Sequence, residues 1–154
     1  MNNLDYVEEY DKLKTKVLKY IIYKKRIKKE IRQKFSKIID EDILEDIVEE
    51  LKENGYIDDS NYIDRAVNEF VALKNMSIKE IKYKLCAKGL SSDIIDEYVS
   101  SHLDELMEYE IKSATNIIIK KQSMQDDEEI KQWLLKKGYI AENVKEAFYN
   151  VERD

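Results

Sequence analysis

The sequence contains no proline and only three glycines in 154 residues. Proline and glycine are the residues that most often interrupt a helix, so this chain has few points at which a helix must end. Lys, Glu, Leu and Ile, which form helices readily, are abundant instead. Hydrophobic residues make up 43% of the chain, enough to bury a core. We therefore predict an all-α protein.

The sequence also has a single cysteine and a single histidine. One cysteine excludes an internal disulfide and fits a reducing compartment. Cys86 follows Leu85 at a core-like position, which predicts a small buried side chain. His102 stands at a predicted helix start, where a structural role is more common than catalysis. Each glycine stands alone, which excludes a glycine-rich phosphate loop. We predict a protein without enzymatic activity, cofactor or metal.

Long apolar runs are missing as well. No stretch of 18 apolar residues indicates a membrane span. The beginning of the sequence, MNNLDYVEEY, lacks the charged and then apolar pattern of a secretion signal. These features predict a cytoplasmic protein.

Charge is distributed unevenly along the chain. The net charge is −6, yet residues 12–37 carry twelve Lys or Arg against one acid, Glu30. Residues 38–73 carry twelve acids against Lys52 and Arg65. A basic block followed by an acidic block favours a surface that meets a polyanion, although a solvated helix face explains it equally well.

Apolar residues recur every three or four positions almost throughout, which is typical of amphipathic helices. The first predicted helix covers residues 5–25. Ile27, Ile31, Phe35 and Ile38 form the stripe of a second, and a third ends at Gly55. The later helices are marked by the capping box Ser77–Glu80, by Ser91 or Ser92, and by the stretch 102–121.

The helices repeat in groups of three. Residues 79–90, KEIKYKLCAKGL, match residues 128–139, EEIKQWLLKKGY, at an offset of 49, and residues 29–39, KEIRQKFSKII, match at 50. A period near 50 predicts tandem units, each too small to be stable alone. We therefore expect three helix-turn-helix-like repeats of three helices, covering 1–55, 56–101 and 102–154. They would pack end to end into an elongated, curved monomer.

A cation follows the shared isoleucine in each predicted repeat. These cations are Arg32, Lys82 and Lys131, and Lys88 and Lys137 match each other before the glycines. A cation repeated at the array period suits a phosphate backbone, which presents charge at regular spacing. The turn before the fourth helix contains Asp58 and Asp59. We expect Asp59 or Ser60 to cap that helix, a role that is more common than metal binding for paired acids at such a place.

Four segments together resemble the RecX family. Residues 54–67, NGYIDDSNYIDRAV, resemble its central signature, a Gly-Tyr-aliphatic-Asp-Asp turn before a helix. Residues 80–90, EIKYKLCAKGL, and 133–140, WLLKKGYI, resemble two helices that end in a lysine, a glycine and an apolar residue. Residues 24–35, KKRIKKEIRQKF, are similar to its basic N-terminal segment. The resemblance runs from about Lys14 to Val151.

This resemblance implies binding in the groove of a RecA–single-stranded DNA filament and inhibition of RecA, and hence control of recombination and the SOS response. It implies no cofactor. A helix-turn-helix transcription regulator and a helical adaptor without nucleic acid remain alternatives. The candidate filament-binding residues are Lys24, Lys25, Arg26, Lys28, Lys29, Arg32, Lys82, Lys88, Lys131 and Lys137. The candidate structural residues are Gly55, Tyr56, Asp58, Asp59, Gly89 and Gly138.

Overall fold

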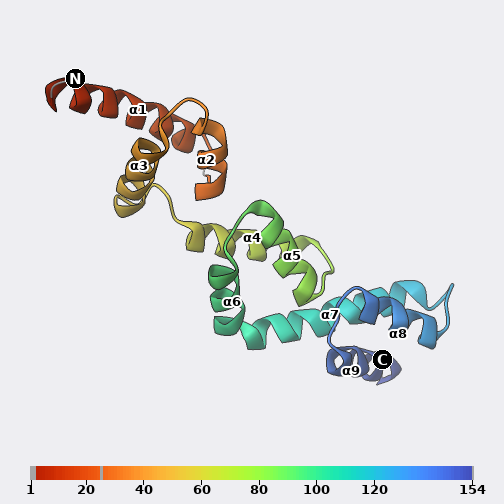
Figure 1. The fold of residues 1–154 in the computed structure, drawn as a ribbon. Helices are drawn as coiled ribbons and strands as arrows, with labels where there is room; N and C mark the ends of the chain where they lie inside the picture. Colours follow the sequence, from red (N-terminus) through yellow and green to blue (C-terminus); the bar gives the residue numbers. More distant parts are fainter. Residues whose placement is uncertain (1–2, 25, 154) are drawn as a thin grey trace. The chain divides into compact units, whose positions relative to one another are not determined.

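The computed structural model describes residues 3–24 and 26–153 (Figure 1). Within these ranges the chain forms nine α-helices and no strand, which confirms the all-α prediction. In order they are α1 (Asn3–Tyr23), α2 (Lys28–Phe35), α3 (Glu41–Glu53), α4 (Asp59–Leu73), α5 (Ile78–Lys88), α6 (Ser92–Ser101), α7 (Leu103–Lys121), α8 (Asp127–Lys136) and α9 (Ala141–Arg153).

The chain divides into two compact units, Met1–Tyr62 and Ile63–Asp154. The first unit contains α1, α2, α3 and the beginning of α4, and the second contains the rest. Each unit has its own hydrophobic core. Val17, Ile31 and Ile47 are fully buried in the first, and Ala114, Ile130 and Leu134 in the second. The predicted division into 1–55, 56–101 and 102–154 stays a prediction.

The repeated positions in α2, α5 and α8 are core positions. Ile31, Ile81 and Ile130 are each fully buried. One helical turn later, the matching residues are Phe35, Leu85 and Leu134, and all three are buried. Residues four apart lie on one face of a helix, so each of these short helices presents the same apolar pair to its neighbours. The sequence period therefore reflects equivalent buried positions in the three helices.

Most of the predicted helix caps are present. Ser77 Oγ accepts the Glu80 amide at 3.0 Å, and the Ser77 amide donates back to Glu80 Oε1 at 3.1 Å. Ser91 caps α6 through the Ile94 amide. Asp126 caps α8 through the Glu129 amide at 2.8 Å. Each side chain satisfies an amide that has no partner inside its helix, which fixes where the helix begins.

Three predictions about local structure were wrong. Ile38 is 64% exposed and its neighbour Ile39 is buried instead, because α2 ends at Phe35 and the helical period no longer applies. Cys86 is exposed. The cap of α4 is neither Asp59 nor Ser60 but Asp58, whose Oδ1 accepts the Asn61 amide at 3.0 Å.

Glycine is required at the turn between α8 and α9. Gly138, between α8 and α9, has a φ of +98°, which residues with a side chain rarely adopt. A Cβ placed there would lie 2.8 Å from Lys79 Cδ, at the beginning of α5. The turn after α8 therefore packs directly against α5.

A buried carboxylate joins the same segments. Glu110 in α7 has no solvent exposure. Its Oε1 accepts the Ile140 amide at 2.6 Å, and its Oε2 accepts the Ile78 amide at 3.2 Å. These two amides stand at the beginnings of α9 and α5, where the positive ends of the helix dipoles favour an anion. Burial raises the pKa of Glu110, and the two backbone hydrogen bonds lower it in part.

We expect Glu110→Ala to lower the free energy of unfolding by several kcal/mol, because each buried amide left without an acceptor costs about 1–3 kcal/mol. Chemical denaturation measures the change. Glu108→Ala, an exposed position on the same helix, is the control and should change it little. Equal stability of the two variants would show that Glu110 does not hold these helices.

The raised pKa of Glu110 also sets a pH dependence. A carboxyl whose pKa is higher in the folded than in the unfolded state binds its proton more tightly when folded. The ionised group therefore costs stability at neutral pH, and the cost is relieved as the pH falls through the raised pKa toward the ordinary 4.5. Relative to Glu110→Gln, the natural chain should gain stability over that fall. Denaturation of both proteins in a pH series tests this, and a relative loss would contradict it.

Candidate nucleic-acid interface

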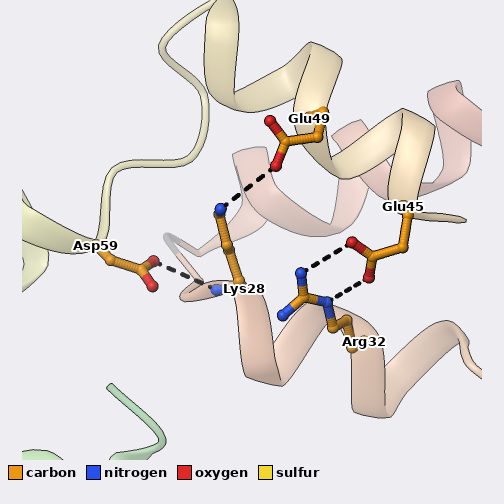
Figure 2. A network of polar contacts seen from close by, with 5 residues as sticks. All are labelled: Lys28, Arg32, Glu45, Glu49 and Asp59. Carbon is orange, nitrogen blue, oxygen red and sulfur yellow. Dashed lines mark hydrogen bonds and ion pairs between the residues drawn. The ribbon is translucent and has the colours of Figure 1, made fainter. Parts of the chain in front are cut away.

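The signature turn before α4 is built by backbone contacts and two carboxylates. Gly55 has a φ of +81°, and the Tyr56 amide closes the end of α3 by bonding to the Leu51 carbonyl at 2.9 Å. Tyr56 is 48% exposed, while Ile57 enters the core. Asp58 caps α4, and Asp59 Oδ1 accepts the amide of Lys28 at 3.3 Å (Figure 2). These hydrogen bonds give both carboxylates a structural role.

The basic face of α2 lies against an acidic face of α3 (Figure 2). Arg32 donates two parallel hydrogen bonds to Glu45, from Nε to Oε1 at 2.6 Å and from Nη2 to Oε2 at 3.0 Å. Lys28 Nζ lies 3.6 Å from Glu49 Oε1. A carboxylate holds each of these cations, so neither presents a free positive charge to a partner.

The same pattern extends to α1. Lys14 Nζ lies 2.9 Å from Glu50 Oε1, and the Tyr10 hydroxyl donates to Glu50 Oε2 at 2.7 Å. The hydrogen bonds from Tyr10 and Lys14 lower the pKa of Glu50. Acids of α3 thus neutralise cations from both preceding helices. The large positive count of residues 12–37 overstates the charge that the folded unit presents.

The remaining candidates of the first unit differ in their surroundings. Arg26 forms an ion pair with Glu30 at 3.7 Å, and its guanidinium carbon lies 4.4 Å from the centre of the Tyr20 ring. Lys24 and Lys29 are exposed, with no ion pair among the described residues. Lys25 lies outside the described residues.

The candidates of the second unit are mostly exposed. Lys82 pairs weakly with Asp96 at 3.9 Å. Lys88 and Lys131 are exposed and have no ion pair within the described part of the chain. Lys137 Nζ lies 5.4 Å from the centre of the Trp133 ring. The positions of Arg32, Lys82 and Lys131 are equivalent in their helices, but a carboxylate holds Arg32 in two hydrogen bonds and none of the described acids pairs with Lys131.

Three aromatic rings are each flanked by two cations; the sequence pattern pointed to Tyr20, within the basic stretch, and missed the grouping at Phe70 and Trp133. We call them the Tyr20 cluster, the Phe70 cluster and the Trp133 cluster. Their members are Tyr20 with Arg26 and Lys34, Phe70 with Lys74 and Lys84, and Trp133 with Lys121 and Lys137. The offset of 50 that joins Tyr20 to Phe70 and Lys34 to Lys84 was the signal that could have revealed them.

Groups able to do chemistry are scarce. His102 lies between α6 and α7, with its ring stacked on Tyr98 and Nδ1 2.9 Å from the Tyr98 carbonyl oxygen. Over residues 3–24 and 26–153, no group of three or more His, Cys, Asp or Glu is arranged to hold a metal ion. None of the helices described is both long and apolar enough to cross a membrane.

Comparison with known proteins gives this arrangement a context. No protein-family model matches the sequence. The chain is 36% identical over 110 residues to the regulatory protein RecX of Clostridium botulinum (strain Eklund 17B / Type B). That match covers 63% of this chain and 50% of the relative, so the chain spans about half the length of the curated relative it matches.

The structural comparison extends over nearly the whole chain. A crystal structure of RecX from Lactobacillus salivarius superposes with a TM-score of 0.79, covering 96% of this chain and 99% of that one, at 24% identity. The chain has the fold of that RecX structure. A second crystal structure, of a regulatory protein RecX, has a TM-score of 0.77 and 19% identity, covering 96% of this chain and 73% of that one. The resemblance to the RecX family read from the sequence is thus confirmed.

The Arg32–Glu45 contact in this RecX fold predicts a pH-dependent coupling. The hydrogen bonds from Arg32 lower the pKa of Glu45 below its ordinary 4.5. The pair therefore stabilises the fold above that value, and its contribution disappears as the pH falls through the lowered pKa. Both side chains are more than 40% exposed, so solvent screening limits the coupling to about 0.5 kcal/mol.

A double-mutant cycle with Arg32→Gln and Glu45→Gln measures this coupling. We expect it to be favourable at neutral pH and absent in strong acid. The same cycle on Lys82 and Asp96, whose charged atoms lie 3.9 Å apart, is the control and should give a smaller value. A coupling for Arg32 and Glu45 that persists unchanged in acid would contradict the prediction.

Proposed function

We propose that this chain regulates homologous recombination and the SOS response by binding RecA filaments on single-stranded DNA and inhibiting RecA. The observation that carries the proposal is the RecX fold over 96% of the chain, together with 36% identity to a protein named as a regulator. The partner is taken from the RecX resemblance, and a cytoplasmic location follows from that partner.

The surface chemistry supports an action through binding. Exposed lysines without ion pairs among the described residues include Lys24, Lys29, Lys88 and Lys131. Such ammonium groups can replace the counterions of phosphates when a nucleoprotein is bound. Acids of α3 neutralise neighbouring cations, so the chain presents mixed charge and not one continuous basic surface. Mixed charge suits a partner that offers both protein and phosphate.

We propose that the chain acts as a monomer and without catalysis or cofactor. Its single histidine is engaged by Tyr98 through both stacking and the contact of Nδ1 with the carbonyl oxygen. Inhibition would then arise from occupancy of the filament. It should saturate with the ratio of this protein to RecA and show no turnover.

The deciding experiment is the ATPase activity of RecA on single-stranded DNA with increasing amounts of this protein. We expect inhibition by the natural chain, and weaker inhibition by the triple variant Lys29→Gln, Lys88→Gln, Lys131→Gln. The slope of log affinity against log salt should fall by about 0.7 for each lysine–phosphate interaction that the variant removes. Melting should change little because exposed charges contribute little to stability.

The matched control carries the same change at three other exposed lysines, Lys16, Lys112 and Lys145. It should inhibit like the natural chain. An ATPase rate that this protein leaves unchanged at any ratio would overturn the proposed function. Tight binding to duplex DNA without RecA would favour a transcription regulator instead.

A further inference from the structure

The three aromatic–cation clusters occupy corresponding places in the helix pairs α1/α2, α4/α5 and α7/α8. Tyr20 and Phe70 lie near the ends of α1 and α4, at an offset of 50. Lys34 and Lys84 lie in α2 and α5, again at an offset of 50. The clusters are therefore a repeated feature of the architecture, although the repeat was recognised from other residues.

In the third cluster the ring and one cation have exchanged helices. The first helix of the pair, α7, carries the cation Lys121, and the second, α8, carries the ring of Trp133. Lys121 near the end of α7 follows Phe70 by 51, which is also the offset between the buried residues Val67 and Ile118. Trp133 in α8 follows Lys84 by 49, the offset that joins the matched segments of α5 and α8. Lys121 Nζ lies 4.3 Å from the centre of the Trp133 ring. The contact between a ring and a cation is thus retained although the two side chains have changed places, which indicates that the contact itself is the repeated feature.

The cations of these clusters are poorly neutralised. Of the six, Arg26 has an ion pair among the described residues, with Glu30 at 3.7 Å. Lys74 and Lys84 lie over the same Phe70 ring, each 5.9 Å from its centre. Side-chain contact with Lys74, and then the charge of Lys74, lower the pKa of Lys84. Two ammonium groups held this close repel one another, and a shared anion would remove that cost.

The geometry points to these clusters as contact points for the phosphate backbone of single-stranded nucleic acid, one on each helix pair. Phosphate supplies the missing negative charge, and the part of each half-buried ring that solvent reaches can meet unpaired bases, which a duplex hides. Each cluster would contact the strand through the same two groups, a cation and an aromatic ring, so binding would not depend on the base sequence. The inference rests on the proposed function and names the residues through which that function would meet DNA.

The first test uses the Phe70 cluster. Lys74→Gln with Lys84→Gln should weaken binding to a fluorescein-labelled oligo(dT), measured by anisotropy without RecA. Counterion release predicts an affinity about eightfold weaker for each phosphate interaction removed at about 50 mM salt, and a salt slope smaller by about 0.7 per interaction. Lys112→Gln with Lys145→Gln, which removes the same charge from the same unit, should bind like the natural chain. Unchanged affinity and slope in the cluster variant would overturn the assignment.

The melting temperature separates a binding role from a purely structural one. If the two lysines only tether α4 to α5 through Phe70, the double variant should melt at a lower temperature than the control variant. If they form an anion site, the variant should melt at the same or a higher temperature, because the repulsion between the lysines is gone. A lower melting temperature with unchanged DNA binding would establish the structural role and refute the proposal.

Tryptophan fluorescence can follow binding at the Trp133 cluster, because Trp133 is the only tryptophan in the chain. We expect oligo(dT) to quench its emission, and Lys121→Gln with Lys137→Gln to shift that titration to higher DNA concentration. Polyglutamate of matched charge should quench far less. Equal quenching by polyglutamate, or no response to oligo(dT) at about 50 mM salt, would overturn the assignment to nucleic acid. Because RecA is absent, these outcomes leave the ATPase test of the proposed function independent.

Discussion

The second unit depends on one carboxylate that water cannot reach. Glu110 stands in the middle of α7, and its two oxygens bind the amides that begin α5 and α9. Helix ends leave backbone amides without partners, and burying such ends is costly unless a side chain satisfies them. Ser77, which caps α5, also donates to the carbonyl oxygen of Lys137 at 2.9 Å. Polar bonds of defined direction thus set how these segments meet, while the apolar core supplies most of the driving force.

The first unit contains a similar but weaker contact between a carboxylate and the amide that begins a helix. The amide of Lys28, the first residue of α2, is bound by Asp59 at 3.3 Å, as the amide of Ile78, the first residue of α5, is bound by Glu110. Burial raises the pKa of Asp59 as it does for Glu110. Asp59 is only half-buried and accepts one amide where Glu110 accepts two. A repeated backbone position is therefore satisfied by acids of different length and burial.

Periodicity and local helix signals were enough to predict much of the fold from the sequence. Ile31, Ile81 and Ile130 were expected in the core and are fully buried. The capping box at Ser77 and the glycine turn at Gly138 were equally local patterns, and both are present. Ile38 and Cys86 were misplaced because a helix end and a helix face depend on tertiary contacts that no short pattern records.

The charge of the candidate interface was harder to predict. One sequence pattern contains Arg32, Lys82 and Lys131, but their surroundings in the fold differ. Arg32 pairs with Glu45, and Lys82 lies near Asp96. Lys131 has no ion pair among the described residues. Which acid meets which cation is decided between helices that are distant in the sequence. The Phe70 and Trp133 clusters were overlooked for the related reason that their members come from two helices and that the ring and the cation are exchanged at Trp133.

The close approach of Gly138 to Lys79 has a consequence for how such a chain can change over evolution. The turn after α8 needs a residue without a Cβ, because Lys79 occupies the space beside it. The turn after α2 has no glycine and no positive φ among its described residues. Although the two helices share their buried positions, their turns differ and meet different surroundings. Placing the turn of one helix after the other would therefore require the turn or its surroundings to be rebuilt.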